Sequence, residues 1–198
     1  LGGMLGSEVW SITEPSPGQH AWLGIDYPSP SDTQLVSPPL DVSANANLIL
    51  TFSHRYKFEF GQTTLWDGGV IEISTDGGQS WVDASTYGAP AYDGVLGDPQ
   101  NQAQNVLKGR MGYADESPAW PLANVETIDF GATLAGQTIQ VRFRIGTDDA
   151  VGDFGWEIDD IAFQGIDNTP FASVIDDAAE CVAPTADAGP DQTVSAGT

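Results

Sequence analysis

Disulfide bonds within the chain are excluded, because its 198 residues include a single cysteine, Cys181. Scarce cysteine is typical of exported bacterial proteins that use Ca²⁺ in place of disulfides to hold the fold together. It is equally typical of cytosolic proteins. The cysteine count alone therefore leaves the compartment open.

Basic residues are also few. The chain has 6 lysines and arginines against 28 aspartates and glutamates, which gives a formal net charge of −22. A surface this acidic excludes binding to nucleic-acid phosphates. Most of the carboxylates serve solubility, and a few can converge on a hard cation such as Ca²⁺.

Long apolar runs are missing as well. The longest, Leu48-Ile49-Leu50, is far shorter than the roughly 18 apolar residues of a membrane span. The first residues lack the charged and apolar regions of a signal peptide. We expect Leu1 to follow a cut within a longer polypeptide.

What the sequence does contain is the alternation typical of β-strands. From Asn47 to Phe60 every second residue is apolar or aromatic, which indicates one buried and one solvated face. Shorter strands are predicted at 8–12, 20–25, 69–75, 80–83, 139–145 and 154–163, with an edge strand after Pro38-Pro39 at 40–42. No helical period is convincing, apart from a weak one at 100–108. Because parallel sheets need helical crossovers, the sequence predicts an all-β, antiparallel two-sheet sandwich.

Two strands allow a prediction about individual side chains. In 69–75 we expect Ile71 and Ile73 to point inward and Glu72 and Ser74 to point outward, before a hairpin turn at 76–78. In the last strand, Trp156 and Ile158 share one parity, whereas Ile161 and Phe163 share the other. If both sets are buried, the register slips by one residue, which predicts a β-bulge at Asp159-Asp160.

The stretch 87–120 is long, polar and rich in glycine and proline, and we expect it to form an elaborate loop. Its aromatic residues have two interpretations. They can anchor the loop to its own domain, or they can form a ligand surface. The candidates for that surface are Tyr87, Tyr92, Tyr113 and Trp120.

No catalytic constellation is recognisable. His20 and His54 are not in a zinc-binding spacing, and His54 lies on the apolar face of its predicted strand, which favours a hydrogen-bonded core histidine. Cys181 has no histidine nearby to act as its base. Several acidic pairs are present, and a glycosidase-like pair of catalytic carboxylates stays open as an alternative. Such pairs are, however, expected by chance at this composition.

The body of the chain resembles the MAM-like jelly-roll modules of secreted bacterial metalloproteases of the immune inhibitor A and fungalysin types. The resemblance covers roughly residues 20–165 and rests on segments 35–40, 52–54, 66–81, 141–144 and 155–161. It implies a jelly-roll sandwich over residues 1–170. After a linker at 171–184, residues 185–198 resemble the first strand of a PKD-type immunoglobulin-like repeat, which implies a modular extracellular parent.

Several carboxylates are candidates for a Ca²⁺ site. A hairpin between 60 and 68 would bring Glu59 close to Asp67, and Asp159 and Asp160 would be costly inside a buried strand unless paired or metal-bound. The pattern Ile158-Asp159-Asp160-Ile161 is also similar to that of jelly-roll carbohydrate-binding modules, and this resemblance implies that Asp159 is the first ligand. The alternatives are a solvated acidic rim, or pairing of the last two aspartates with Arg142 or Arg144.

Together these observations predict a secreted bacterial module that is not itself an enzyme. The leading hypothesis is a Ca²⁺-stabilised module that positions, targets or attaches a secreted enzyme, with a metalloprotease as the expected parent. Its partners would be neighbouring domains of the same polypeptide and a polysaccharide or protein surface. The alternatives are a carbohydrate-binding module that uses the aromatics of loop 87–120, and a structural spacer or adhesion domain.

Overall fold

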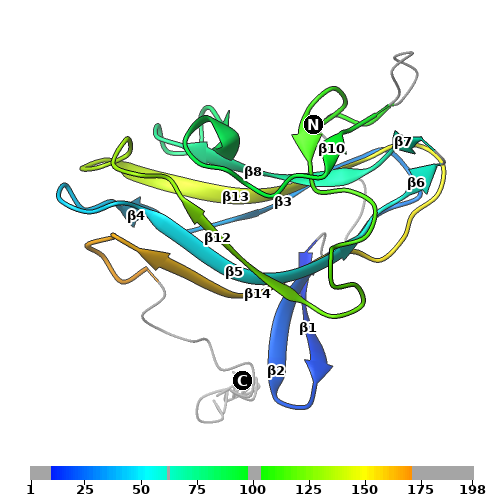
Figure 1. Cartoon of the computed structure of the whole chain (residues 1–198), viewed down its shortest axis with the longest axis horizontal. Helices are drawn as coiled ribbons and strands as arrows, with labels where there is room; N and C mark the ends of the chain where they lie inside the picture. Colours follow the sequence, from blue (N-terminus) through cyan, green and yellow to red (C-terminus); the bar gives the residue numbers. More distant parts are fainter. Residues whose placement is uncertain (1–9, 62, 98–103, 171–198) are drawn as a thin grey trace, which may run out of the picture.

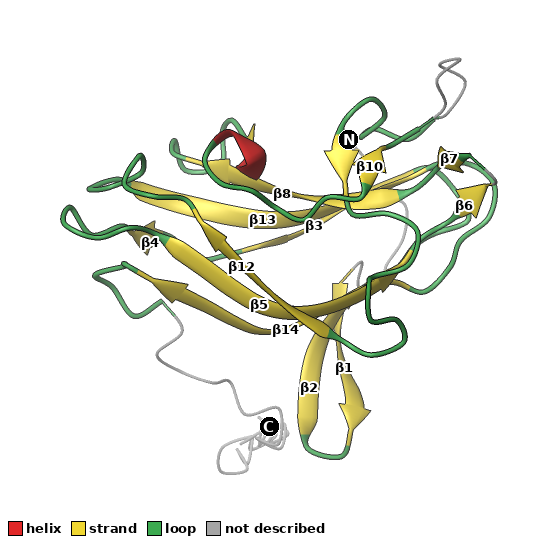
Figure 2. Cartoon of the chain, in the orientation of Figure 1, coloured by secondary structure: helices red, strands yellow, loops and turns green. Residues whose placement is uncertain are grey.

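The computed structural model describes residues 10–61, 63–97 and 104–170, and these form a two-layer β-sandwich (Figures 1 and 2). The linker and PKD-type fragment predicted for 171–198 lie outside the described residues. All strand pairs of the two main sheets are antiparallel. The only helical element in the described part is a 3₁₀ turn, Ala84–Thr86. The predicted all-β antiparallel sandwich is therefore confirmed.

The first sheet has the strand order β1-β2-β14-β5-β12. Its strands are β1 (Trp10–Ser16), β2 (Gln19–Gly24), β14 (Gly155–Gln164), β5 (Ile49–Lys57) and β12 (Asn124–Asp129). The second sheet has the order β3-β13-β8-β9, and β4 also pairs with β13. Its strands are β3 (Ser31–Val36), β13 (Thr138–Thr147), β8 (Gly68–Ser74), β9 (Val82–Asp83) and β4 (Leu40–Asp41).

Along the chain the main strands alternate between the two sheets. β2 lies in the first sheet, β3 in the second, β5 in the first, β8 in the second, β12 in the first, β13 in the second and β14 in the first. This alternation is the connectivity of a jelly roll. Two small hairpins, β6 (Phe60–Gly61) with β7 (Thr64–Leu65) and β10 (Gly94–Val95) with β11 (Met111–Gly112), complete the fold.

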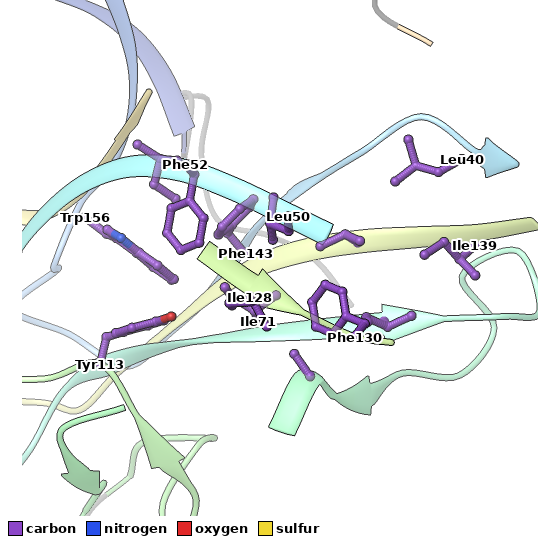
Figure 3. Close-up of a cluster of buried hydrophobic side chains, with 14 of the residues drawn as sticks. Leu40, Leu50, Phe52, Ile71, Tyr113, Ile128, Phe130, Ile139, Phe143 and Trp156 are labelled. Carbon is purple, nitrogen blue, oxygen red and sulfur yellow. The ribbon is translucent and has the colours of Figure 1, made fainter. Parts of the chain in front are cut away.

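The core lies between the sheets and is rich in aromatic residues (Figure 3). Strand β5 supplies Leu50, Phe52 and Tyr56 to it, and its alternate residues are partly exposed, as the two-residue period predicts. The Phe52 ring meets the Phe143 ring edge-on at 5.4 Å between centroids, across the gap between the sheets. Such pairs contribute about 0.5–1.5 kcal/mol beyond their burial.

Strand β8 differs from the prediction, because all seven of its residues are buried. Ile71 and Ile73 point into the core and Glu72 and Ser74 lie on the other face, as expected, but Glu72 and Ser74 are buried as well. The loop region after β9 covers this second face and adds a small cluster made of Val70, Leu96, Leu107 and Ala114. Figure 1 shows β10 lying over β8 on the side away from the first sheet.

Buried Glu72 is held by arginines. Its carboxylate accepts from Arg110 at 2.7 Å and from Arg142 at 2.5 Å, and Arg110 also pairs with Asp83 at 2.6 Å. A buried carboxylate is tolerable when it is paired in this way. Arg110 therefore fastens the loop 87–120 to the second sheet.

The β-bulge predicted in the last strand is confirmed. Asp159 lies opposite Ser53 and Ala162 opposite Thr51, so three steps along β14 match two steps along β5. Asp160, the extra residue, has a left-handed φ of 51°. Trp156 and Ile158 before the bulge, and Ile161 and Phe163 after it, all pack against the core.

Truncation after Pro170 is expected to leave the thermal midpoint of the protein nearly unchanged. The reason lies in the sequence, because the alternation typical of strands fades after Phe163. Differential scanning calorimetry of the truncated and full chains would check this. A drop of more than a few degrees would show that the tail docks on the sandwich.

The turn after β8 is organised by Asp76. Its Oδ1 accepts from the backbone N–H of Gln79 at 3.0 Å and of Ser80 at 2.9 Å, and its Oδ2 accepts from the Ser80 hydroxyl at 2.5 Å. These bonds, led by the Ser80 hydroxyl, lower the pKa of Asp76 to about 2.

An Asp76→Ala variant is expected to melt earlier, because those backbone donors lose their acceptor; the loss of a comparable capping side chain predicts a decrease of about 2–5 °C. A folded-state pKa below the ordinary value of 3.8 stabilises the protein above about pH 4, and this contribution disappears as the pH falls toward 2. The difference between variant and wild type should therefore shrink at acid pH in thermal melts. An unchanged difference between about pH 6 and pH 2 would contradict this role.

Candidate metal centre

Four acidic residues from four separate connections meet at one end of the sandwich. Asp26 follows β2, Glu59 lies between β5 and β6, Asp67 lies between β7 and β8, and Asp148 follows β13. Figure 1 shows the β6–β7 hairpin and the connection from β13 to β14 side by side at this end. We call these four residues the acidic centre.

Asp67 is the innermost member and is fully buried. Its Oδ1 accepts from the backbone N–H of Asp148 at 2.7 Å, whereas its Oδ2 has no hydrogen-bond partner. Burial, followed by the neighbouring Asp26 carboxyl, raises the pKa of Asp67. A buried carboxylate oxygen without a hydrogen-bond donor lowers the stability of the fold, and such oxygens are rare in native proteins.

Asp26, in the connection after β2, is also a buried carboxyl group with one oxygen that lacks a partner. It is 2% exposed, and its Oδ2 accepts from the backbone N–H groups of Glu59 at 2.9 Å and of Asp153 at 3.0 Å. Its Oδ1 is buried and has no partner, and burial raises its pKa. The carboxyl groups of Asp26 and Asp67 lie within hydrogen-bonding reach of each other, so a proton or a cation must separate them.

Glu59 and Asp148 complete the centre on its outer side. One carboxylate oxygen each of Glu59, Asp67 and Asp148 lie within 4.8 Å of one another. Oxygens bound to one Ca²⁺ at about 2.4 Å can be at most about 4.8 Å apart, so this spacing suits a single ion. Burial raises the pKa of Glu59, as do the nearby charges of Asp148 and Asp26.

The described residues place no positive charge in contact with these four carboxyl groups. Within the described part of the chain, none of the ion pairs includes a member of the acidic centre. The nearest pairing is that of Lys57, which binds Glu116 at 3.3 Å and Asp153 at 3.4 Å. The centre is therefore built from oxygen donors only, which is the donor set that Ca²⁺ and Mg²⁺ prefer.

Hydrogen bonds and close backbone packing hold the segments that carry the acidic centre. Asn105 is buried and donates to the carbonyl groups of Trp66 at 2.8 Å and Gly146 at 2.7 Å, which ties the connections that carry Asp67 and Asp148. Gly152 packs so closely on the carbonyl of Asp26 that a Cβ would clash with it. Supporting contacts of this kind orient ligands in metal sites.

Two of the four predicted metal ligands lie elsewhere. The structure brings Glu59 and Asp67 together, as the hairpin predicts, but Asp159 and Asp160 lie at the bulge of β14, opposite Ser53. They are partly and fully exposed, so they are not the buried pair that the prediction assumed. The alternative pairing with arginine is also wrong, because Arg142 binds Glu72 and Arg144 binds Asp32.

The sequence interpretation missed Asp26 and did not choose Asp148. Asp148 lies in the acidic run Asp148-Asp149 that follows a clear strand, which was a usable signal. Asp26 is an isolated acid after a weakly patterned strand, and only the tertiary structure places it against Asp67.

The four aromatic candidates for a ligand surface all make contacts within the protein, and only Tyr113 is fully buried. Tyr113 is fully buried and donates to Glu126 at 2.9 Å, and Tyr92 packs against the core and bonds to the backbone of Ile71. Tyr87 also packs on the core, and Trp120 meets the Phe154 ring edge-on at 5.0 Å. These side chains anchor the loop, which was the other interpretation.

His54 is a core histidine, as its strand position predicts. It is 2% exposed and accepts from the indole N–H of Trp156 at 3.2 Å, while burial lowers its pKa to about 4.

No family model matches the sequence, and no curated protein matches it either. The fold and the acidic centre therefore define the class on their own: an antiparallel β-sandwich with a buried carboxylate cluster at one end. Among the described residues, no helix is long and apolar enough to cross a membrane.

Proposed function

We propose that the chain is a non-catalytic extracellular module whose sandwich is stabilised by one Ca²⁺ ion at the acidic centre. The observation that carries the proposal is the pair of buried, unpartnered oxygens, Asp67 Oδ2 and Asp26 Oδ1, beside Glu59 and Asp148. An ion held by Glu59, Asp67 and Asp148 would give Asp67 Oδ2 a partner and offset the repulsion among the carboxylates, including that from the neighbouring Asp26.

The ion would have a structural role. The three carboxyl groups that suit one ion, those of Glu59, Asp67 and Asp148, come from connections that flank β5, β8 and β13, which belong to both sheets. A single ion would therefore tie the two layers together at one end, as disulfides do in other small extracellular domains. A chain with one cysteine has no intrachain alternative of that kind.

The module's wider role follows from the sequence. Its resemblance to accessory modules of secreted metalloproteases favours a role in positioning, targeting or attaching such an enzyme. A carbohydrate-binding role for loop 87–120 would have to use Tyr87, Tyr92 and Trp120, which are partly exposed, because Tyr113 is buried. The structural-spacer hypothesis is compatible with the same calcium site.

Isothermal titration of chelator-treated protein tests the calcium site. We expect one Ca²⁺ per chain, weaker binding of Mg²⁺, and a higher thermal midpoint with Ca²⁺. An Asp159→Ala variant should bind Ca²⁺ as the wild type does, because Asp159 lies outside the acidic centre. Absence of binding, or loss of binding in Asp159→Ala, would refute the assignment.

A further inference from the structure

Strand β2 pairs with only the first part of β14. The two strands pair at Trp156, Glu157 and Ile158, and beyond Ile158 no strand in the described part of the chain pairs with that side of β14. Figure 1 shows the β1–β2 hairpin projecting from the sheet there. The divergence leaves an open strand edge that begins at the bulge.

A pocket of about 310 Å³ lies in this divergence. Its apolar walls are Ile12, Ala21, Trp22 and Ile161, and its polar lining is His20, Asp159 and Asp160. Trp22 is 37% exposed and Ile12 is 46% exposed, although both are large apolar side chains. Apolar surface left beside an open strand edge is typical of an interaction site.

The charge of the pocket is uncompensated. Asp159 accepts only from the backbone N–H of Asp160 at 2.7 Å, and the Asp160 carboxylate makes no hydrogen bond or ion pair among the described residues. Arg55, on the adjoining strand β5, lines a neighbouring pocket together with the two aspartates. It is already bound by Glu157 at 2.7 Å and by the carbonyl of Pro121 at 2.9 Å. Among the described residues, no ion pair involves either aspartate.

We propose that this pocket binds an arginine or lysine side chain of an extended segment of a partner protein, which adds to the open edge of β14. The apolar walls suit the aliphatic stem, the Trp22 ring suits stacking of a cation, and the two carboxylates suit its charged end. The open edge offers backbone groups to an added strand, which fixes the segment while the pocket selects the side chain. The inference goes beyond the calcium site and uses none of its residues.

The probe is the acetylated, amidated peptide Thr-Val-Arg-Val-Thr, compared with the same peptide carrying citrulline, which keeps the shape of arginine without the charge. Binding to the full chain, in calcium-containing buffer, is followed by the indole N–H signals of the tryptophans in NMR spectra. We expect the arginine peptide to shift the Trp22 signal and to bind about tenfold or more tightly than the citrulline peptide.

Two matched variants distinguish binding in the pocket from nonspecific attraction to the negative charge of the protein. Asp160→Asn should weaken binding about fivefold or more, and asparagine tolerates the left-handed conformation of this residue, so the bulge is kept. Asp167→Asn removes the same charge at an exposed residue outside the pocket and should change affinity less than about twofold. Equal binding of both peptides, equal effects of both variants, or no binding would overturn the proposal. So would Trp22-dependent binding of a neutral oligosaccharide in place of the peptide.

Discussion

An Asp67→Asn variant is expected to be more stable than the wild type without calcium and to gain nothing from calcium. In the calcium-free wild type, folding forces Asp67 into burial beside Asp26, which raises the pKa of its carboxyl. Asparagine carries no charge to desolvate, and its side-chain oxygen can still accept from the backbone N–H of Asp148. We expect the calcium-free variant to gain roughly 2–4 kcal/mol, or about 5–10 °C in thermal midpoint, at neutral pH.

In calcium the order is reversed. The wild type should gain about 3 kcal/mol when the free ion exceeds its dissociation constant a hundredfold, whereas the variant should gain almost nothing. Thermal melts of both proteins in chelator and in excess calcium make the comparison, with Asp167→Asn as the control for loss of a surface charge. If Asp67→Asn lowers the calcium-free midpoint, or keeps the calcium response, Asp67 is not a ligand.

The fold could be predicted because the strongest signals are local. Alternation along β5 and the parity change in β14 depend only on residues in one strand, and both predictions are confirmed. The two-sided burial of β8 could not be predicted, because its second cover comes from the distant loop that contains Leu96 and Leu107. Which polar residues a loop will bury is a property of the assembled structure.

The acidic centre was likewise predictable where its residues are close in sequence and not where only the tertiary structure brings them together. A short hairpin predicts that Glu59 and Asp67 are close, and they are. Asp26 joins them from a segment more than thirty residues away, and no spacing rule encodes that approach. Asp159 and Asp160 attracted the prediction because they interrupt a strand. The bulge exposes them instead, so burial no longer demands a metal there.

The free energy of unfolding of the calcium-free protein is expected to fall as the pH rises from about 7 to about 9. Carboxylates usually have the opposite effect, because they stabilise a protein at neutral pH and lose that contribution in acid. Burial raises the pKa of Asp67 to about 9 and also raises that of Asp26, whereas both side chains titrate near 3.8 when unfolded. The folded state therefore holds a proton that the unfolded state has released. The cost is about 1.4 kcal/mol per pH unit well below the folded pKa and about half of that at about pH 9, which gives roughly 2 kcal/mol across the window.

His54 and Asp76 contribute almost nothing to the slope in this window. His54 is neutral in both states above about pH 7, since burial lowers its folded pKa from an ordinary value of 6.5, and Asp76 is ionised throughout. Urea unfolding at several pH values, in chelator and in calcium, measures the slope. Bound calcium displaces the proton, so the slope should vanish in calcium, and it should also be much smaller in Asp67→Asn without calcium. A calcium-free wild type as stable at about pH 9 as at about pH 7 would show that the two buried aspartates do not share a proton.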